Sequence, residues 1–181
     1  PGIAHFYPLD THVMYTRAVP DDPLYSNQWH LKNTGQTNGT VGADANTEPA
    51  WDGYRGTNVV IAIVDDGLQH THPDLIANYD ASLSYDFRDG DPDPAPITGG
   101  TCFNPVVADC HGTSVAGVAA AVGFNGLGVT GSAPAATLAG LRLIGGAITD
   151  QQEADALSFE NQQIDIYNNS WGPNDAFDGT A

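Results

Sequence analysis

Three apolar segments have the pattern of strands that are covered on both faces. They are NVVIAIV at 58–64, TLAGLRLI at 137–144 and IDIYNNSWG at 164–172. Near-continuous apolar runs are typical of a parallel sheet between helices, whereas half-exposed strands alternate with a period of two. We therefore predict three strands of a parallel sheet, the third of them also buried.

Two segments between these runs predict helices. GTSVAGVAAAV at 112–122 is rich in alanine and small enough to pack tightly as a buried helix. TDQQEADALSFE at 149–160 begins like a capping box, because Thr149 and Gln152 have the required spacing. Strands that alternate with helices indicate an α/β fold, with a parallel sheet flanked by helices.

The remaining segments predict an N-terminal extension and two long loops. Residues 1–19 show no clear periodicity, and the sequence PDDP at 20–23 then interrupts the chain. We expect the extension, which is either a prosegment remnant or an arm of the mature protein, to end there and the main domain to cover 20–181. Regions 76–110 and 173–181 are rich in Asp, Pro and Gly, and are expected to form loops.

The charge of the chain is strongly one-sided. It has 22 acidic and 5 basic residues, a net charge of −17, and only 15% charged residues in all, so it is chiefly short of lysine. Such a field repels nucleic acid and anionic membranes and attracts cations and basic peptides. The excess of acid fits either solubility in a salty or extracellular medium or the binding of metals and basic substrates. Because no apolar run approaches the roughly 18 residues of a membrane span, none is predicted.

Candidate catalytic groups follow the first strand and begin the alanine-rich helix. Asp65 and Asp66 stand at the carboxyl end of the strand, where functional groups collect in open parallel sheets, and His111 stands at the helix start. An acid that orients a histidine, with that histidine as general base, forms two thirds of a hydrolytic triad. The alternative is a helix-capping aspartate and an ordinary histidine.

Several motifs occur together and in a characteristic order. They are VDDGLQHTHPDL, YDFRDGDPDP, HGTSVAGVAAA, GLRLI, TDQQEA and NNSWGP. Over residues 20–181 they resemble the subtilisin superfamily of serine proteases, and within it the kexin/furin-like branch. The resemblance implies a subtilisin-like α/β fold and a secreted, calcium-dependent endopeptidase.

The resemblance also assigns the catalytic residues. It implies that Asp65 is the triad acid and His111 the base. Ser114 is not the nucleophile, since a serine inside this helix bonds back to the helix backbone. The catalytic serine and the oxyanion asparagine are expected on a second polypeptide, separated by a nick after the loop NDAFDGTA at 174–181, so that this chain alone is inactive.

The substrate-binding residues are implied in the same way. The backbone of Ser170, Trp171 and Gly172 forms one wall, and the segment from Leu143 to Gly145 forms the other. Acids at the subsites favour cleavage after basic residues; they are Asp66 for the P2 residue, Asp175 for S1, and Glu153 and Asp178 near S4. The chain departs from the branch at Ala108, Asp109 and Cys110, and at Gly145, where an acid is frequent.

Calcium sites are expected because carboxylates crowd one loop. Residues 85–94 contain four aspartates that repel one another without a cation, although a solvated acidic loop is an alternative. By resemblance, one site consists of Asp86, Asp91 and Asp93. A second site consists of Asp22, Asp74, Asn125 and the carbonyls of Val122, Leu127 and Val129.

Three further interpretations concern the cysteines, two histidines and the function class. Cys102 and Cys110 do not match a CxxC motif, and in an extracellular protein they predict a local disulfide rather than two free thiols. His70, His72 and Asp74 allow a zinc site with a small set of ligands. Such a site would make the protein a metal-dependent hydrolase. A non-catalytic pseudoprotease module that binds calcium or peptides is the remaining alternative.

Overall fold

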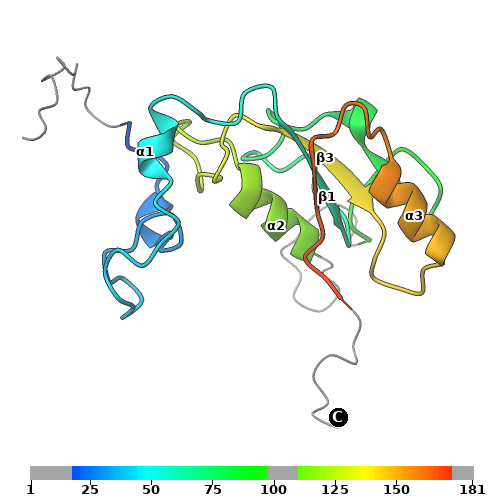
Figure 1. Ribbon diagram of the computed structural model, residues 1–181, viewed down its shortest axis with the longest axis horizontal. Coiled ribbons are helices and arrows are strands. Elements are labelled where there is room, and N and C mark those ends of the chain that lie inside the picture. Colours follow the sequence, from blue (N-terminus) through cyan, green and yellow to red (C-terminus); the bar gives the residue numbers. More distant parts are fainter. Residues whose placement is uncertain (1–17, 98–109, 173–181) are drawn as a thin grey trace, which may run out of the picture.

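A four-stranded parallel sheet organises the computed structural model, which describes residues 18–97 and 110–172. The strand order is β2–β3–β1–β4, as Figure 1 shows in part. The strands are β1 (Val60–Asp65), β2 (Tyr85–Asp86), β3 (Thr137–Arg142) and β4 (Ile166–Asn168). The helices are α1 (Glu48–Trp51), α2 (His111–Ala120) and α3 (Asp150–Ser158), with 3-10 turns at Tyr25–Asn27 and Ala81–Leu83. The predicted α/β class is confirmed.

The register places the three predicted strands side by side. Strand β1 pairs with β3 from Val60 opposite Thr137 to Asp65 opposite Arg142, and with β4 on its other edge. The strands are shorter than predicted at several ends. The expectation that 76–110 holds only loops is wrong, because β2 pairs with the end of β3.

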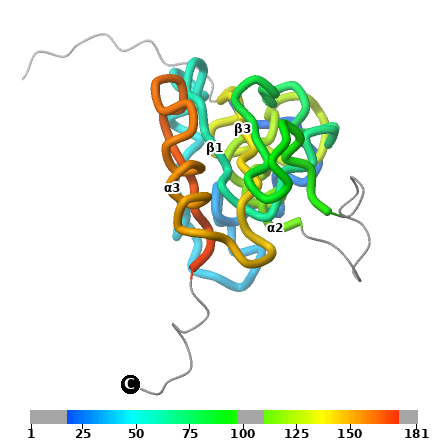
Figure 2. Tube along the Cα trace, turned by 90° about the vertical axis from the view of Figure 1, so that its right-hand side faces the viewer, coloured from blue at the N-terminus to red at the C-terminus, as the bar shows by residue number. Residues whose placement is uncertain are grey.

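Successive side chains of β1 enter two different cores. Ile61 and Ile63 pack with Ala116 of α2, whereas Ala62 and Val64 pack with Ala156 of α3. Figure 2 shows the sheet with α3 on one side and α2 on the other. A strand covered on both faces needs apolar residues at every position, which explains the unbroken run.

Helix α2 is buried on one side only. Its buried residues include Ala116 and Ala120, and a side chain added at Gly131 would lie 2.4 Å from the Cα of Ala120. Small residues therefore let a neighbouring loop approach the helix closely. Val118, however, is 51% exposed, so the prediction of a buried helix is wrong for the outward face.

The predicted start of the second helix is confirmed, whereas the third predicted strand is shorter and more exposed than expected. Thr149 and Gln152 form the capping box that their spacing predicts, and the helix follows directly. Strand β4 covers only three of the expected residues, and Ile166 is 49% exposed. The prediction of a buried strand is wrong here because β4 is the edge strand of the described sheet.

The acidic loop after β2 contains its own counter-charge. Arg142, at the end of β3, is only 3% exposed, and its Nη1 donates to Asp86 and to Asp89 (2.7 Å). The other oxygen of Asp86 accepts the amides of Arg88 (2.8 Å) and Asp89 (3.0 Å). One buried guanidinium and several amides thus offset the repulsion between these carboxylates.

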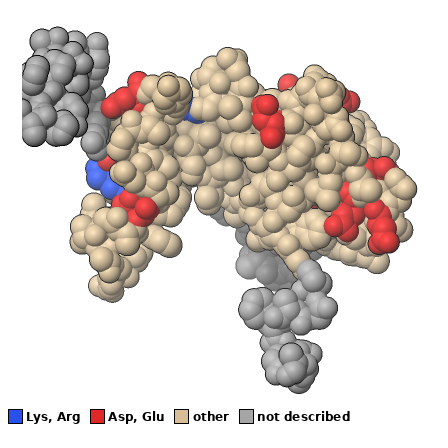
Figure 3. Space-filling model, viewed as in Figure 1, with Lys and Arg blue, Asp and Glu red and all other residues tan. Residues whose placement is uncertain are grey.

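The charged side chains are unevenly distributed over the surface. Figure 3 shows a group of carboxylates over the end that carries α3 and others near the α1 end, whereas the basic atoms seen in this view lie toward the α1 end. No helix within the described ranges is long and apolar enough to cross a membrane.

Replacing Arg142 with Met should destabilise this domain by about 3–5 kcal/mol, because it leaves a buried carboxylate without its partner. The free energy of unfolding, from urea denaturation of the full-length protein followed by tryptophan fluorescence, measures the loss. The matched control is Arg88→Met, since Arg88 only reaches the carbonyl of Ile144 at 3.3 Å and should cost about 1 kcal/mol. Equal losses in the two variants would contradict a special role for Arg142.

Candidate active site

Asp65 lies at the end of β1, the strand whose two edges pair with later strands of the chain. After β1 the chain forms β2, returns by way of α2 to β3 on one edge of β1, and then passes by way of α3 to β4 on the other edge. The carboxyl end of such a central strand is the usual ligand-binding position in open α/β sheets. Asp65 ends β1, and its carbonyl accepts the amides of Leu143 (2.8 Å) and Ile144 (3.2 Å).

The carboxylate of Asp65 contacts the imidazole of His111. Nδ1 of His111 lies 2.9 Å from Oδ1 and 3.0 Å from Oδ2 of Asp65. The Asp65 side chain is fully buried, whereas that of His111 is 55% exposed. Because a carboxylate only accepts, Nδ1 donates and Nε2 keeps its lone pair, which is the tautomer that a general base requires.

The acids around His111 alter its affinity for protons. The hydrogen bond to Asp65 raises the pKa of His111 above its ordinary value. Partial burial opposes this effect, and the charges of Asp65 and Asp66 add to it. The pair therefore stabilises the imidazolium that a proton transfer from a nucleophile would create.

A cavity of about 370 Å³ lies beside this pair. Its lining consists of His111, Ser114, Val115, Val118, Ala119, Ser132, Asn168 and Ser170. Ser114 donates to the carbonyl of Cys110 at 3.0 Å, which confirms the prediction that it bonds back to its helix. The other two serines also donate to protein oxygens. Among the described residues, the imidazole has Asp65 as its only hydrogen-bond partner.

The two predicted walls follow the strands on either side of β1. Leu143 is buried and continues β3, whereas Gly145 is exposed with a φ of +100°. On the other side, Trp171 donates its indole N–H to the carbonyl of Val64 at 2.7 Å, and its neighbours Ser170 and Gly172 are exposed. The end of β1 thus lies between two segments with accessible backbone.

The acids predicted for the subsites are placed unevenly. Asp66 is buried, and its carboxylate accepts the amides of His111 (3.1 Å) and Gly112 (2.7 Å). Glu153 lies in the first turn of α3 and is partly exposed. Asp175 and Asp178 lie outside the described residues.

The structure favours neither the first calcium site nor the zinc site. Asp86 is engaged by Arg142, and Asp93 contacts His70 at 3.0 Å and the amide of Ala95 at 3.1 Å. Asp91 accepts the amide of Asp93. Within the ranges described, no group of three or more His, Cys, Asp or Glu side chains is arranged to hold a metal ion. The described side chains therefore give the zinc alternative no support.

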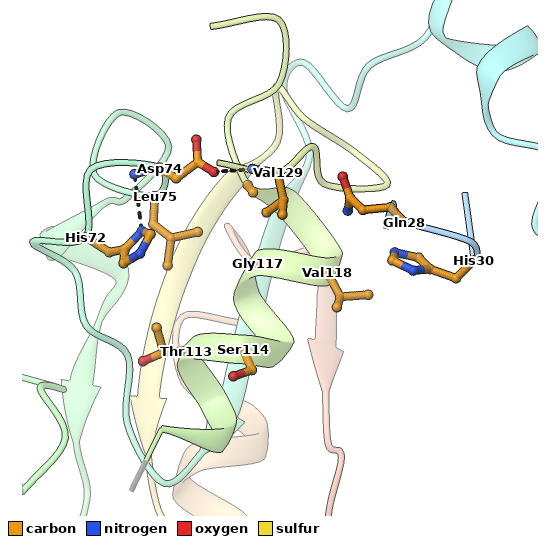
Figure 4. Close-up of a pocket in the computed structure, with 11 residues that line it drawn as sticks. Gln28, His30, His72, Asp74, Leu75, Thr113, Ser114, Gly117, Val118 and Val129 are labelled. Carbon is orange, nitrogen blue, oxygen red and sulfur yellow. Dashed lines mark hydrogen bonds between the residues drawn. The ribbon is translucent and has the colours of Figure 1, made fainter. Parts of the chain in front are cut away.

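The second predicted calcium set surrounds the loop 122–130. Asp22 accepts the amide of Phe124 (2.8 Å) and the hydroxyl of Thr130 (2.7 Å). Asp74 accepts the side chain of Asn125 (3.0 Å) and the amide of Val129 (2.8 Å), the latter shown in Figure 4. The remaining predicted ligands also belong to this loop: the amide of Val122 donates to the carbonyl of Asp74, and that of Leu127 donates to Asn125.

This second set has the chemistry of a cation site. Asp22 and Asp74 are 4% and 3% exposed, and neither has a basic partner in the part of the chain that the structure describes. Buried carboxylates are costly unless a cation or many hydrogen bonds compensate them. Both also face a loop rich in amide and carbonyl groups, so the residues fit calcium.

Three residues that support the site were not predicted from the sequence. A side chain at Gly112 would lie 2.4 Å from the carbonyl oxygen of Gly67, so α2 requires glycine there. Thr113 accepts the amide of Gln69 at 2.9 Å. Arg142 could have been noticed as a charged residue within an apolar strand of a chain that has only 5 basic residues.

The α/β fold and the acid–histidine pair at the end of β1 define a protein of the subtilisin-like serine protease class. Residues 56–181 match the Subtilase family, and the chain belongs to it. The predicted resemblance, including its kexin-like branch, is confirmed by the relatives that follow.

The relatives include convertases of animals. A PC3-like endoprotease of Hydra vulgaris is 45% identical over 87% of this chain and 21% of its own length. Human neuroendocrine convertase 2 is 45% identical over 86% of this chain and 24% of its own. Mouse proprotein convertase subtilisin/kexin type 4 is 44% identical over 92% and 24%. The chain thus spans a fifth to a quarter of these relatives.

A bacterial protease has a similar structure. The serine protease of Aeromonas sobria aligns with a TM-score of 0.74 and 34% identity, covering 96% of this chain and 30% of that one. In a second structure, where that protease is in complex with a chaperone, the TM-score is 0.72. The chain therefore corresponds to part of a subtilisin-like domain.

His111 should titrate above the roughly 6.5 of an ordinary histidine, and Asp65→Asn should lower its midpoint, because the variant removes the charge that favours imidazolium. The pH dependence of diethyl pyrocarbonate modification of His111, followed by peptide mass spectrometry, measures this. Asp155→Asn, at an exposed position on α3, is the control and should leave the midpoint in place. An unchanged midpoint in Asp65→Asn would show that the contact does not form.

Proposed function

We propose that this chain supplies the acid and the base of a kexin-like serine endopeptidase. The observation that carries the proposal is the contact of 2.9 Å between Nδ1 of His111 and the buried carboxylate of Asp65, beside an open cavity. Membership of the Subtilase family supports it. Residues 20–181 then form the N-terminal part of a catalytic domain, with 1–19 preceding it.

The reaction is acyl transfer to a serine and then to water. Nε2 of His111 takes the serine proton while the oxygen attacks the peptide carbonyl, and the resulting imidazolium gives that proton to the leaving amine. A water molecule, deprotonated by the same nitrogen, then releases the acid and restores the serine. Asp65 keeps the imidazole oriented throughout and stabilises its charged form.

The nucleophile comes from a segment outside residues 1–181, on a second polypeptide or on a continuation of this one. The bond from Ser114 to Cys110 supports this, because it occupies the hydroxyl nearest in sequence to His111. The asparagine that stabilises the oxyanion is proposed to lie in the same segment as the nucleophile, outside residues 1–181. Without them the chain has a base but no group for the base to activate.

The substrate is a peptide or protein in extended conformation. Its backbone pairs with the segments Ser170–Gly172 and Leu143–Gly145, which adds a strand between them. Main-chain pairing selects no sequence, so selection depends on charge. The net charge of −17 and the acids Glu153, Asp175 and Asp178 favour basic residues, and cleavage after Arg or Lys is proposed.

Calcium stabilises the domain through the second ligand set. Asp22 and Asp74 would hold the ion with Asn125 and the carbonyls of Val122, Leu127 and Val129. The ion would offset the burial of two carboxylates and tie residues 20–47, the N-terminal arm that precedes α1, to the loop 122–130. The compartment is the secretory pathway or the extracellular space, where calcium is abundant. A disulfide between Cys102 and Cys110 stays a prediction; Cys102 lies outside the described residues, and Cys110 directly precedes α2.

In the full-length protein, His111→Ala should reduce kcat/KM by about 10⁶-fold and Asp65→Asn by about 10⁴-fold on fluorogenic peptides that end in Arg or Lys at P1. Ser114→Ala is the control and should keep the activity, because among the described residues its hydroxyl bonds only to the backbone at the start of the helix. A serine-directed phosphonate should label a serine outside 1–181.

Two results would contradict this function. Wild-type protein that neither cleaves the peptides nor takes up the phosphonate would indicate a pseudoprotease that only binds. Loss of activity in Ser114→Ala together with labelling of Ser114 would overturn the assignment of the nucleophile.

Removing calcium with a chelator should lower the melting temperature of the wild-type protein. The stabilisation expected at a calcium concentration of about 100 times Kd is about 2.7 kcal/mol. Asp74→Asn should lose most of this shift, measured by differential scanning fluorimetry with and without calcium. The matched control is Asp44→Asn, because Asp44 also accepts backbone amides in the N-terminal arm but lies outside the ligand set. An equal calcium shift in both variants would exclude the site.

A further inference from the structure

The second acid of the DDG motif, Asp66, binds the first turn of the helix that carries His111. Its Oδ2 accepts the amide of His111 at 3.1 Å, and its Oδ1 accepts the amide of Gly112 at 2.7 Å. These amides have no partner within the helix, because the first N–H groups of any helix point out of its end. A carboxylate that bridges two of them forms charge-assisted hydrogen bonds and also complements the helix dipole.

The helix approaches β1 more closely than a side chain would allow. A Cβ at Gly112 would lie 2.4 Å from the carbonyl oxygen of Gly67 and 2.7 Å from Cβ of Asp65. One residue further on, Thr113 accepts the amide of Gln69. Three consecutive residues at the start of α2 are thus anchored to the turn that follows β1.

This anchoring determines where the imidazole lies. The His111 side chain is 55% exposed and is held by Asp65 at one end only. Its backbone position is therefore the other constraint on its distance from Asp65, and Asp66 provides that constraint through the His111 amide itself. A displacement of this amide by about 1 Å would move Nε2 by a similar amount, enough to lower catalysis about 10²-fold.

We propose that Asp66 is a positioning residue for His111, and that it acts on every substrate whatever residue stands at P2. The proposal rests on the proposed peptidase function. It differs from a role as the acid of the P2 subsite, because the carboxylate is already bound by two amides of α2 before any substrate arrives. The two acids of the motif then have separate roles: Asp65 orients the imidazole of His111, and Asp66 fixes the backbone amide of His111.

The kinetic test uses the full-length protein and two peptides that share Arg at P1 and differ at P2, one with Lys and one with Ala. Asp66→Ala should lower kcat by about 10²-fold for both peptides with little change in KM. Asp66→Asn, which keeps the shape and one acceptor oxygen, should lose less. A loss confined to the Lys peptide and expressed in KM would overturn the proposal in favour of a subsite acid.

A second readout does not depend on turnover. The pH midpoint of diethyl pyrocarbonate modification of His111 should fall in Asp66→Asn, since the charge of Asp66 adds to the effect of Asp65. Asp80→Asn is the matched control, because Asp80 caps the 3-10 turn Ala81–Leu83 in a similar way but lies outside the site. An unchanged midpoint in Asp66→Asn would contradict the proposal, even if the wild-type protein proved to have no peptidase activity.

Discussion

The close approach of helix α2 to the turn after β1 is the constraint on which the site depends. A hydrogen bond between a fully buried carboxylate and a half-exposed imidazole needs the two backbones to be held within a narrow range of distance. Glycine at 112 permits that range, and the hydrogen bonds from Asp66 and Thr113 maintain it. The proposed base and the segment proposed as one substrate wall are both placed relative to this junction, because the carbonyl of Asp65 also accepts the amides of Leu143 and Ile144.

Each of the buried carboxylates discussed above has nearby groups that offset its charge or its burial. Asp65 and Asp66 are compensated by an imidazole and by helix amides, and Asp86 by a buried guanidinium. Asp22 and Asp74 receive only neutral donors from the protein, among the residues described. This difference supports the proposed calcium dependence, since burying a carboxylate among neutral donors is costly and a bound cation would offset that cost.

The sequence predicted those features that depend on local pattern. An unbroken apolar run identified the buried strand β1, and the spacing of Thr149 and Gln152 identified the start of α3. The predictions failed where a feature depends on contacts with distant parts of the chain. Strand β4 is exposed because it is an edge strand, and Asp86 pairs with an arginine 56 positions away. The hydrogen bonds of Asp66 to the first turn of α2 were not predicted, because sequence alone does not show that α2 begins beside it.

The strand order explains why an acid, a base and two substrate walls meet at one point. Connections on opposite faces bring β3 and β4 to opposite edges of β1, so the segments after all three strands leave the sheet at the same end. Strand β1 carries the acid, and helix α2, which connects β2 to β3, begins at that end and carries the histidine. A hydroxyl brought to the cavity lined by His111 and Ser170 needs only to reach Nε2, because the tautomer and orientation of the imidazole are already set by this part of the chain. The acid–base side of the proposed active site is therefore a property of the β1–α2 junction. In the proposed peptidase, the other segment has to position only one serine oxygen and the oxyanion donors.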